Sequence, residues 1–317
     1  MIKISIIIPV YQVEQYIEAC LNSVASQTMT KELECLVVDD CGSDGSLDIA
    51  KRFIASYCGN IKFRLIQREC NGGLSAARNS GINEARGEYV YFLDSDDAIT
   101  SGCMEEMWSL VDKYGSVDLV QSTSTEEESE LDKKGPYSFP QYTTDSKLIK
   151  NFLLTYNGDI IGAQGRLVKT SLIKSNKLFF KEGIIHEDNH WSFFLAKFVK
   201  SMAFDNHKTY FHRYNPSSIT NNVNVAKEAF SYKIIINDFS HNIDSFLSGR
   251  QKELTLCNLL TSFAYLNANE RKEMVRNFMH SNGMLEKLLL FSYLNMCGKY
   301  LKNKLLHLLI RLYKIYD

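Results

Sequence analysis

The sequence lacks several features that would assign it to other protein classes. Among its 317 residues it has four prolines, two tryptophans and no run of 18 uninterrupted apolar residues. Without such a run, we expect no membrane-spanning helix. Lys and Arg total 36 against 37 Asp and Glu, a formal net charge of -1. Because nucleic-acid-binding domains carry a basic excess, this balance predicts no nucleic-acid partner.

The eight cysteines also lack a pattern. No pair has the C-x-x-C spacing of a structural zinc site, and cysteines scattered through a chain of this length favour a reducing compartment over a disulfide framework. The apolar run at residues 4–10 is short, and no small-residue cleavage site follows it. The sequence therefore predicts a cytoplasmic protein.

What the chain does contain is a globular composition, with 45% hydrophobic and 23% charged residues. Its length predicts two domains, which we place at residues 1–224 and 225–317. β-branched and apolar runs alternate with helical periodicity in the first hundred residues, which predicts strands at 4–10, 34–40, 62–67 and 88–93. Repeated β-α-β units of this kind form a parallel sheet covered by helices on both faces. We expect Pro9 to end the first strand.

Acidic residues follow two of these predicted strands, at Asp39, Asp40, Asp94, Asp96 and Asp97. In such sheets, ligands bind beyond the carboxyl ends of the strands. Five carboxylates on one edge repel one another, which predicts a metal ion among them. Oxygen ligands suit Mg²⁺ or Mn²⁺. A calcium-binding EF-hand loop starting at Asp94 is excluded, because Ile99 occupies the position that requires glycine.

Simpler interpretations of these motifs stay open at this point. Asp39 and Asp40 are also typical of a turn that caps a helix. The glycine-rich stretches at 41–46 and 71–73 match neither a P-loop nor a dinucleotide-binding fingerprint.

Four motifs, in order and spacing, resemble family 2 of the inverting glycosyltransferases. They are SIIIPVY at 5–11, VDDCGSDGS at 38–46, NGGLSAARNSG at 71–81 and YFLDSDD at 91–97. The resemblance implies an α/β fold of the GT-A type: a mostly parallel sheet flanked by helices, followed here by an all-helical C-terminal region.

The resemblance also assigns roles to individual residues. Asp96 would bind the diphosphate of a nucleotide sugar through Mn²⁺ or Mg²⁺. Either Asp39 or Asp40 would hold the uracil ring of the nucleotide. The implied donor-binding residues are Pro9, Val10, Tyr11, Asp39, Asp40, Arg78, Asp94, Ser95, His212 and Arg213.

A later segment, EGIIHEDNHWSFF at 182–194, resembles the Glu-Asp motif of the family. Asp188 would then be the general base, with Glu187 beside it. The alternative is a pair of acids that stabilise a helix start through the helix dipole. His186 and His190 have the spacing of a zinc pair, but no Glu-x-x-His context supports it. In FHRYNPSSIT at 211–220, His212 or Arg213 would contact the leaving diphosphate; a surface loop at a sheet edge is the alternative.

One segment departs from the pattern of the family. Relatives often have Trp and Lys where this chain has Gln164 and Arg166. Because this segment borders the acceptor side, the acceptor cannot be inherited from the resemblance.

The region after residue 224 is predicted to be helical and basic, with 13 Lys and Arg against 8 Asp and Glu. The last predicted helix places basic residues on one stripe beside a wide apolar face; they are Lys304, His307, Arg311 and Lys314. This pattern suits the surface of an anionic membrane, which predicts peripheral binding at the inner face of the cytoplasmic membrane. Packing on its own domain or on a second copy of the chain stays equally open.

Together these features predict an inverting, metal-dependent glycosyltransferase. It would move a sugar from a nucleotide sugar, expected to be a UDP-sugar, to a hydroxyl of a saccharide or lipid-linked saccharide acceptor in bacterial capsule, O-antigen or exopolysaccharide synthesis. The alternative is a catalytically inactive relative that binds a sugar nucleotide as a partner subunit or scaffold. A sugar-nucleotide pyrophosphorylase is excluded, because residues 10–14 lack the glycine-rich, arginine-containing loop it requires.

Overall fold

The computed structural model describes residues 1–135, 138–154, 162–219, 221–222 and 224–242, together with Leu247 and Asn269. The chain groups into two compact units. The first contains Met1–Gly183 and Glu187–Asn222, and the second contains Ile184–His186 and Val223–Asp317. Each unit is described by itself below.

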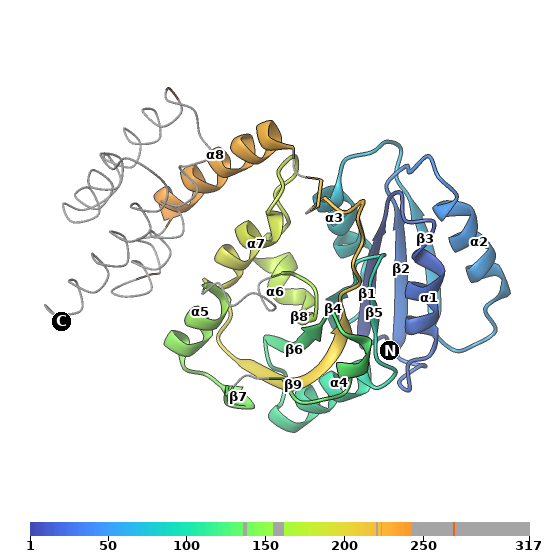
Figure 1. The fold of residues 1–317 in the computed structure, drawn as a ribbon. Helices are drawn as coiled ribbons and strands as arrows, with labels where there is room; N and C mark the ends of the chain where they lie inside the picture. The colour runs from blue at the N-terminus through green and yellow to red at the C-terminus, as the bar shows by residue number, and fades with distance from the viewer. Residues whose placement is uncertain are drawn as a thin grey trace, which may run out of the picture. The chain divides into compact units, whose positions relative to one another are not determined.

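The first unit begins with the parallel half of a sheet, formed by four strands in the order β3-β2-β1-β4 (Figure 1). All three neighbouring pairs are parallel. Every residue of β1, β2 and β4 is buried, as expected for apolar strands covered on both faces. The predicted strands are therefore present, with these bounds: β1 Ile4–Val10, β2 Leu33–Asp39, β3 Lys62–Gln67 and β4 Tyr89–Phe92.

The expectation that Pro9 ends the first strand was wrong, since β1 continues to Val10. The backbone of Val10 accepts a hydrogen bond from Asp40 on the β2 side, whereas Ile7 accepts one from Leu93 on the β4 side. By strand alternation, Pro9 also faces β4, which ends at Phe92. Its missing N–H therefore removes no bond from the ladder, and the strand tolerates the proline.

Helices α1 (Ile17–Ala25), α2 (Ser46–Ser56), α3 (Leu74–Glu84) and α4 (Cys103–Tyr114) follow strands of this sheet. Alternate residues of β1 share a core with α1 and α4; they are Ile4, Ile6, Ile8 and Val10. Ile7 points to the other face, where α3 packs. A Cβ on Gly81 of α3 would lie 2.4 Å from Ile7 Cγ2, so glycine permits this close helix–strand contact.

The second half of the sheet mixes strand directions. Its order continues from β4 through β8 (Arg166–Lys169), β6 (Leu119–Thr125), β9 (Met202–Phe211) and β5 (Ala98–Ile99), while β7 (Tyr142–Thr143) also pairs with β9. β6 and β9 are parallel, and β8 is antiparallel to both β4 and β6. The remaining elements of this unit are the 3₁₀ turn Glu128–Glu130 and helices α5 (Ser146–Leu154), α6 (Thr170–Ser175) and α7 (Glu187–Leu195). The described sheet therefore has the mostly parallel, helix-flanked architecture that the sequence predicts.

In the second unit, the structure describes helix α8 (Val225–Asn242) and the short segment Ile184–His186. Within this unit, the Ser231 hydroxyl accepts a 2.9 Å hydrogen bond from the Ile185 backbone, and the ring of His186 stacks on Tyr232. The basic stripe predicted at residues 304–314 lies outside the described residues. None of the helices described combines the length and apolar character needed to cross a bilayer.

Candidate functional site

The predicted site residues of the parallel half meet at the carboxyl edge of the sheet. Val10 is in register with Asp39 at the ends of β1 and β2, and Asp94 follows β4 directly. Pro9 and Val10 are buried, whereas Tyr11, the next residue, is 46% exposed. Of these three residues, Tyr11 therefore offers a side chain to a ligand at this edge.

Asp39 and Asp40 have different surroundings, although both are buried. Asp40 forms an ion pair with Arg68 and accepts backbone hydrogen bonds from Gly72 at 3.0 Å and Gly73 at 2.8 Å. Its carboxylate thus holds the loop that leads into α3. Asp39 accepts one backbone hydrogen bond, from Cys41 at 3.2 Å. Among the contacts described, Asp39 therefore keeps more acceptor capacity for a ligand.

The turn after β4 distributes its carboxylates among different partners. Asp94 forms a 2.7 Å ion pair with Arg78. Asp96 accepts a 2.8 Å hydrogen bond from the side-chain amide of Asn215. Ser95, between them, is buried at 6% exposure. The turn therefore connects the end of β4 both to α3 and to the segment after β9.

Asp97 anchors the segment that follows β9. It is fully buried and accepts hydrogen bonds from the Tyr210 hydroxyl at 2.6 Å and the Arg213 backbone at 2.9 Å. His212 Nδ1 lies 3.2 Å from Asp97. This hydrogen bond raises the pKa of His212 to about 9, so the ring is protonated at neutral pH. The His212 side chain is 51% exposed, which leaves it accessible to an anionic ligand.

Arg78 connects two segments that are more than a hundred residues apart in the sequence. Its guanidinium lies 2.7 Å from Asp94 and 2.7 Å from Glu187, the first residue of α7. Arg78 is 2% exposed. Although burial opposes the charge, the adjacent carboxylates of Asp94, Glu187 and Asp188 raise the pKa of Arg78. The bridge therefore fixes the start of α7, and with it Asp188, beside the turn after β4.

Asp188 is half-buried, and its carboxylate accepts a hydrogen bond from the Asn189 backbone at 2.8 Å. Arg166, one of the two departures from the family pattern, is fully buried nearby. It donates to Gln121 at 2.9 Å and to Ser192 of α7 at 2.6 Å. Burial lowers the pKa of Arg166 to about 10, and the attraction of Asp188 opposes this shift. The Arg166 guanidinium therefore lies close enough to interact electrostatically with Asp188, the predicted general base.

Asp96 has the properties expected of a metal-binding carboxylate. Burial, together with the neighbouring Asp97 and Asp94 carboxylates, raises the pKa of Asp96 to about 6. A divalent cation would relieve this repulsion. One protein carboxylate also fits Mg²⁺ or Mn²⁺, because these ions take their remaining ligands from phosphate oxygens and water. The residues present therefore fit such an ion.

A metal ion is not needed to compensate all five acids at this edge, contrary to the expectation from the sequence. Protein groups already compensate three of them: Arg68 for Asp40, Arg78 for Asp94 and protonated His212 for Asp97. Asp39 and Asp96 are the two that have no ion pair with a described residue.

Two contributors to the site were not identified from the sequence. Asn215 binds Asp96, and Tyr210 binds both Asp97 and, through its oxygen at 3.2 Å, the backbone of Asp94. Asn215 lies inside the FHRYNPSSIT motif, so the motif could have identified it as a site residue. Tyr210 lies just before the motif, on an apolar strand, and no pattern distinguishes it from a core residue.

Comparisons with known proteins agree with this geometry. The family model of "Glycosyl transferase family 2" matches residues 5–176. The putative glycosyltransferase EpsH of Bacillus subtilis is 32% identical over 68% of this chain and 62% of its own length. Poly(ribitol-phosphate) beta-N-acetylglucosaminyltransferase TarS of Staphylococcus aureus is 31% identical over 57% of this chain and 30% of its own length. The chain thus spans less than two thirds of these relatives.

Solved structures show the same fold. S. aureus TarS residues 1–349 in complex with UDP-GlcNAc superimposes with a TM-score of 0.70 and 21% identity, covering 92% of this chain and 85% of that one. A mannosyltransferase from Pyrobaculum calidifontis in complex with GDP-Man and Mn²⁺ gives a TM-score of 0.58 at 13% identity, covering 99% and 86%. Because its family model matches more than half of the chain, this protein belongs to glycosyltransferase family 2 and has a GT-A-like fold.

Proposed function

We propose that this protein is an inverting glycosyltransferase that moves a sugar from a UDP-sugar to a hydroxyl of a saccharide or lipid-linked saccharide acceptor. The observation that carries the proposal is the Arg78 bridge, which links the acidic turn after β4 to the Glu187–Asp188 pair at the start of α7. It holds Asp94, which is proposed to contact the donor, near Asp188, which is proposed to be the general base.

The nucleotide is proposed to bind at the ends of β1 and β2. Asp39 is the better candidate for the base of the nucleotide, because Asp40 is occupied by Arg68 and two backbone amides. A buried carboxylate with free acceptor capacity suits the imide N–H of uracil. The exposed ring of Tyr11 lies two positions beyond Pro9, where it can stack on the base.

The diphosphate is proposed to lie between Asp96 and the segment after β9. Asp96 would hold Mn²⁺ or Mg²⁺, which supplies charge neutralisation to the phosphate oxygens when bound. Protonated His212 adds a second positive charge, and the Arg213 guanidinium lies over the rings of Tyr16 and Phe211 nearby. These side chains would stabilise the charge that develops on the departing diphosphate.

Asp188 is proposed to take the proton from the attacking hydroxyl. The acceptor oxygen would approach the anomeric carbon from the side opposite the leaving diphosphate. A single displacement of this kind inverts the anomeric configuration. Glu187 is then a positioning residue, because its contact with Arg78 fixes the start of the helix that carries the base.

A cavity of about 550 Å³ beside His212 is proposed to receive the acceptor. Its lining includes Gln164, Lys208, Tyr210 and His212, together with three glutamates of the segment after β6. Among these glutamates, Glu130 pairs with Lys133 and Lys208. Glu126 and Glu127 are exposed and form no described ion pair, so the surroundings favour a neutral or amino-sugar acceptor over a polyphosphate.

The proposal is tested by Asp188→Asn, assayed with UDP-sugars and Mn²⁺. Because general-base catalysis contributes about 10²–10⁴-fold, we expect a loss of transfer of that size with donor affinity unchanged in calorimetry. Asp112→Asn, on the exposed face of α4, is the matched control and should transfer sugar at the normal rate. NMR of the product should show a β-linkage from an α-linked donor.

Normal transfer by Asp188→Asn would remove Asp188 as the base. Donor binding without any transfer by the unmodified protein, across the donors that bind, would instead support the inactive partner-subunit alternative. The functions proposed for residues 225–317, membrane attachment or self-association, are separable from this test, because they predict vesicle binding or a change in sedimentation.

A further inference from the structure

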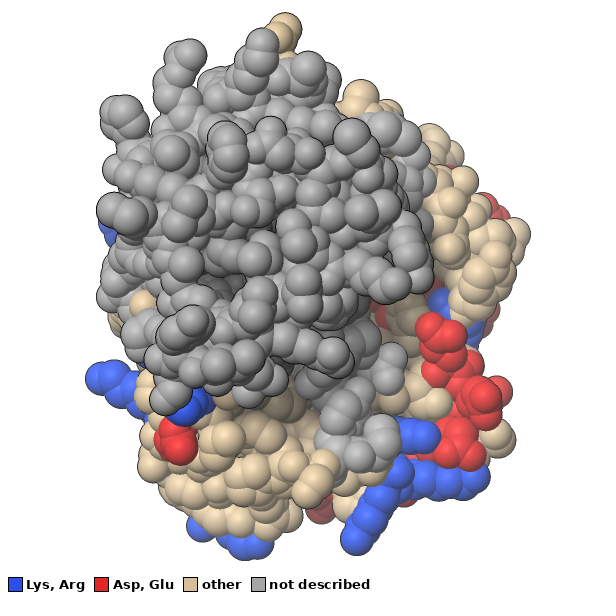
Figure 2. Space-filling model, turned by 60° about the vertical axis from the view of Figure 1, so that its left-hand side comes forward, with Lys and Arg blue, Asp and Glu red and all other residues tan. Residues whose placement is uncertain are grey.

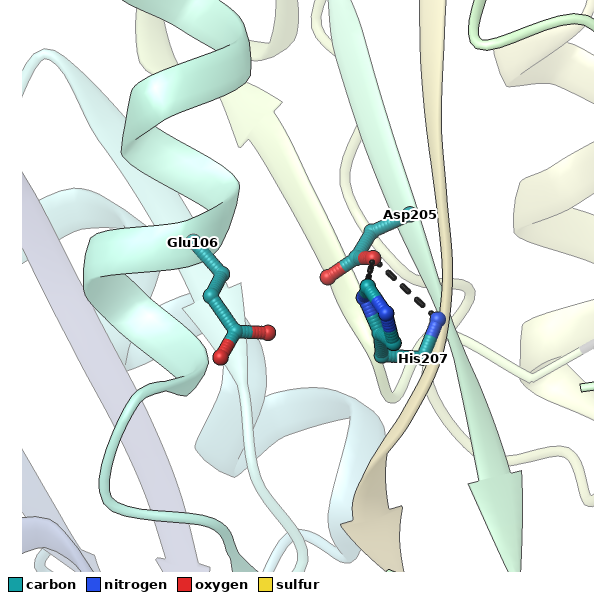
Figure 3. Close-up of side chains that lie close together, drawn as sticks. All are labelled: Glu106, Asp205 and His207. Atoms are coloured by element: carbon teal, nitrogen blue, oxygen red, sulfur yellow. Dashed lines mark hydrogen bonds and ion pairs between the residues drawn. The ribbon is translucent and has the colours of Figure 1, made fainter. Parts of the chain in front are cut away.

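A second cluster of metal-binding side chains lies apart from the carboxyl-edge site. Glu106 on α4 and Asp205 and His207 on β9 place one ligand atom each within 4.8 Å of one another (Figure 3). The cluster shares no residue with the predicted donor site, and Asp205 is five residues before Tyr210 along β9. Two carboxylates and an imidazole are a ligand set used by zinc.

Two residues of the cluster lie at an irregularity in β9. The register of β6 and β9 pairs Gln121 with Phe204 and then Thr123 with Lys208, so β9 contributes extra residues in between. Such a bulge re-aims side chains and often lies beside a functional site. Asp205 and His207 lie in this irregular stretch, and because they are two residues apart, both side chains lie on the same face of β9, toward Glu106 of α4 (Figure 3).

Each acid of the cluster has one buried carboxylate oxygen that receives no hydrogen bond. Asp205 is 7% exposed, and its Oδ2 is buried without a hydrogen-bond partner. In Figure 3, one Asp205 oxygen points toward the Glu106 carboxylate while the other contacts His207. Glu106 Oε2 is likewise buried and unpartnered. A buried carboxylate oxygen without a partner destabilises the fold, so a positively charged ligand would be favoured at this cluster.

The imidazole of His207 is held by Asp205. Asp205 Oδ1 accepts a 3.1 Å hydrogen bond from the His207 backbone and lies 2.8 Å from His207 Nδ1. Hydrogen bonds of this kind fix ring orientation in metal sites. Oδ1 thus holds the histidine, and Oδ2 stays available.

No lysine or arginine compensates these acids. In the described part of the chain, neither Glu106 nor Asp205 forms an ion pair with one, since Lys208 and Lys133 pair with Glu130 instead. Asp132 lies close enough to add further negative charge at Glu106. The cluster therefore contains an excess of acidic side chains.

We propose that Glu106, Asp205 and His207 form a zinc site that fastens α4 to the bulge of β9. Zinc binds three protein ligands and a water in a tetrahedron, with its ligand atoms roughly 3.4 Å apart. Glu106, whose side chain is half-buried, would close the remaining gap by a change of rotamer. Because α4 follows the Asp94–Asp97 turn and β9 leads to His212, the ion stabilises both elements on which the carboxyl edge depends.

The test is equilibrium dialysis of the untagged full-length protein with Zn²⁺, without nucleotide and with a non-thiol reductant, followed by elemental analysis. We expect one zinc per chain. Asp205→Asn and His207→Gln should each lower the bound zinc at least tenfold. Asp96→Asn, which alters the predicted donor-site metal ligand, is the matched control and should still bind one zinc per chain. Zinc should also raise the melting temperature of the unmodified protein but not that of His207→Gln.

Three outcomes would overturn the site: no zinc bound by the unmodified protein, unchanged stoichiometry in His207→Gln, or loss of zinc in Asp96→Asn. The first would leave two carboxyls that share a proton. If circular dichroism shows that Asp205→Asn does not fold, Glu106→Gln replaces it, because Glu106 is half-buried, less buried than Asp205, and the substitution preserves shape. None of these outcomes depends on sugar transfer, so the site can fail or stand separately from the proposed function.

Discussion

The parallel and mixed halves of the sheet contribute to the site in different ways. In the parallel half, acids meet partners that lie within about thirty residues along the chain, as Asp40 meets Arg68 and Gly72. At the junction with the mixed half, partners come from more than a hundred residues away: Arg78 meets Glu187, and Asp97 meets Tyr210. The acids of the parallel half can thus be arranged by local β-α-β units, whereas those at the junction need the whole sheet.

We therefore expect the two regions to have different functions. The ends of β1 and β2 are proposed to bind the nucleotide, and the junction of β4, α7 and the segment after β9 is proposed to carry the chemistry. Substitution of a residue that faces the ligand in the first region, such as Asp39, should then change mainly donor affinity. Substitutions at the junction should change turnover, stability or the charge state of a catalytic group.

The largest effect is expected from Arg78→Met. Removing the guanidinium leaves Glu187 buried and Asp94 partly buried, without their ion-pair partner. Loss of one partner from such a buried pair costs about 3–5 kcal/mol of unfolding free energy. We therefore expect that decrease in urea denaturation, together with a loss of turnover, because the start of α7 is no longer fixed beside the turn after β4.

Arg64→Met is the matched control for this prediction. Arg64 also bridges two carboxylates, Glu34 and Glu84, but it lies on β3, away from the carboxyl edge, and is 25% exposed. Glu34 keeps hydrogen bonds from Ser5 at 2.6 Å and from the Arg86 backbone at 2.7 Å. We expect about 1 kcal/mol or less. Equal losses in the two variants would contradict a special role for the Arg78 bridge.

A smaller effect is expected when Asp39→Asn and Asp40→Asn are compared. Asp39→Asn should weaken UDP binding by about 10- to 100-fold, since a hydrogen bond to a charged group contributes about 1.5–3 kcal/mol, with little change in melting temperature. Asp40→Asn should mainly lower the melting temperature, because it weakens the Arg68 pair and the contacts with Gly72 and Gly73. Calorimetry and thermal denaturation measure the two quantities. The reverse pattern would show that Asp40, rather than Asp39, contacts the nucleotide base.

The sequence predicts the parallel half well for a physical reason. Strands β1, β2 and β4 are buried on both faces, and the helices have clear periodicity. Local patterns therefore predict the bounds of β1, β2 and β3 to within one residue. The motif acids then fall at strand ends by topology alone. Pro9 was misjudged because its tolerance depends on where β4 ends, and the sequence of β1 contains no information on that.

The mixed half was less predictable because its contacts are non-local. Strand β9 contains Asp205, Asn206, His207 and Lys208 among apolar residues, and no alternation shows that it pairs with β6, β5 and β7 at once. The zinc cluster was missed for the same reason. Glu106 is an ordinary acid in the first turn of a helix, and only the fold brings it within reach of a bulge nearly a hundred residues later.

The smallest and most specific effect is expected from Asp97→Asn. The Asp97 carboxylate raises the pKa of His212 from its ordinary value of 6.5 to about 9, mainly through the hydrogen bond to Nδ1. A raised pKa means that the His212–Asp97 attraction stabilises the fold fully below pH 6.5 and is lost as pH rises through 9. In Asp97→Asn, we expect an NMR titration of the ring to show a pKa that returns toward 6.5. At pH 8, His212 would then be largely neutral in the variant but protonated in the unmodified protein, so donor affinity should fall at pH 8 much more than at pH 6. An unchanged His212 pKa in Asp97→Asn would show that other carboxylates of the turn, rather than Asp97, set the charge of the residue proposed to face the leaving diphosphate.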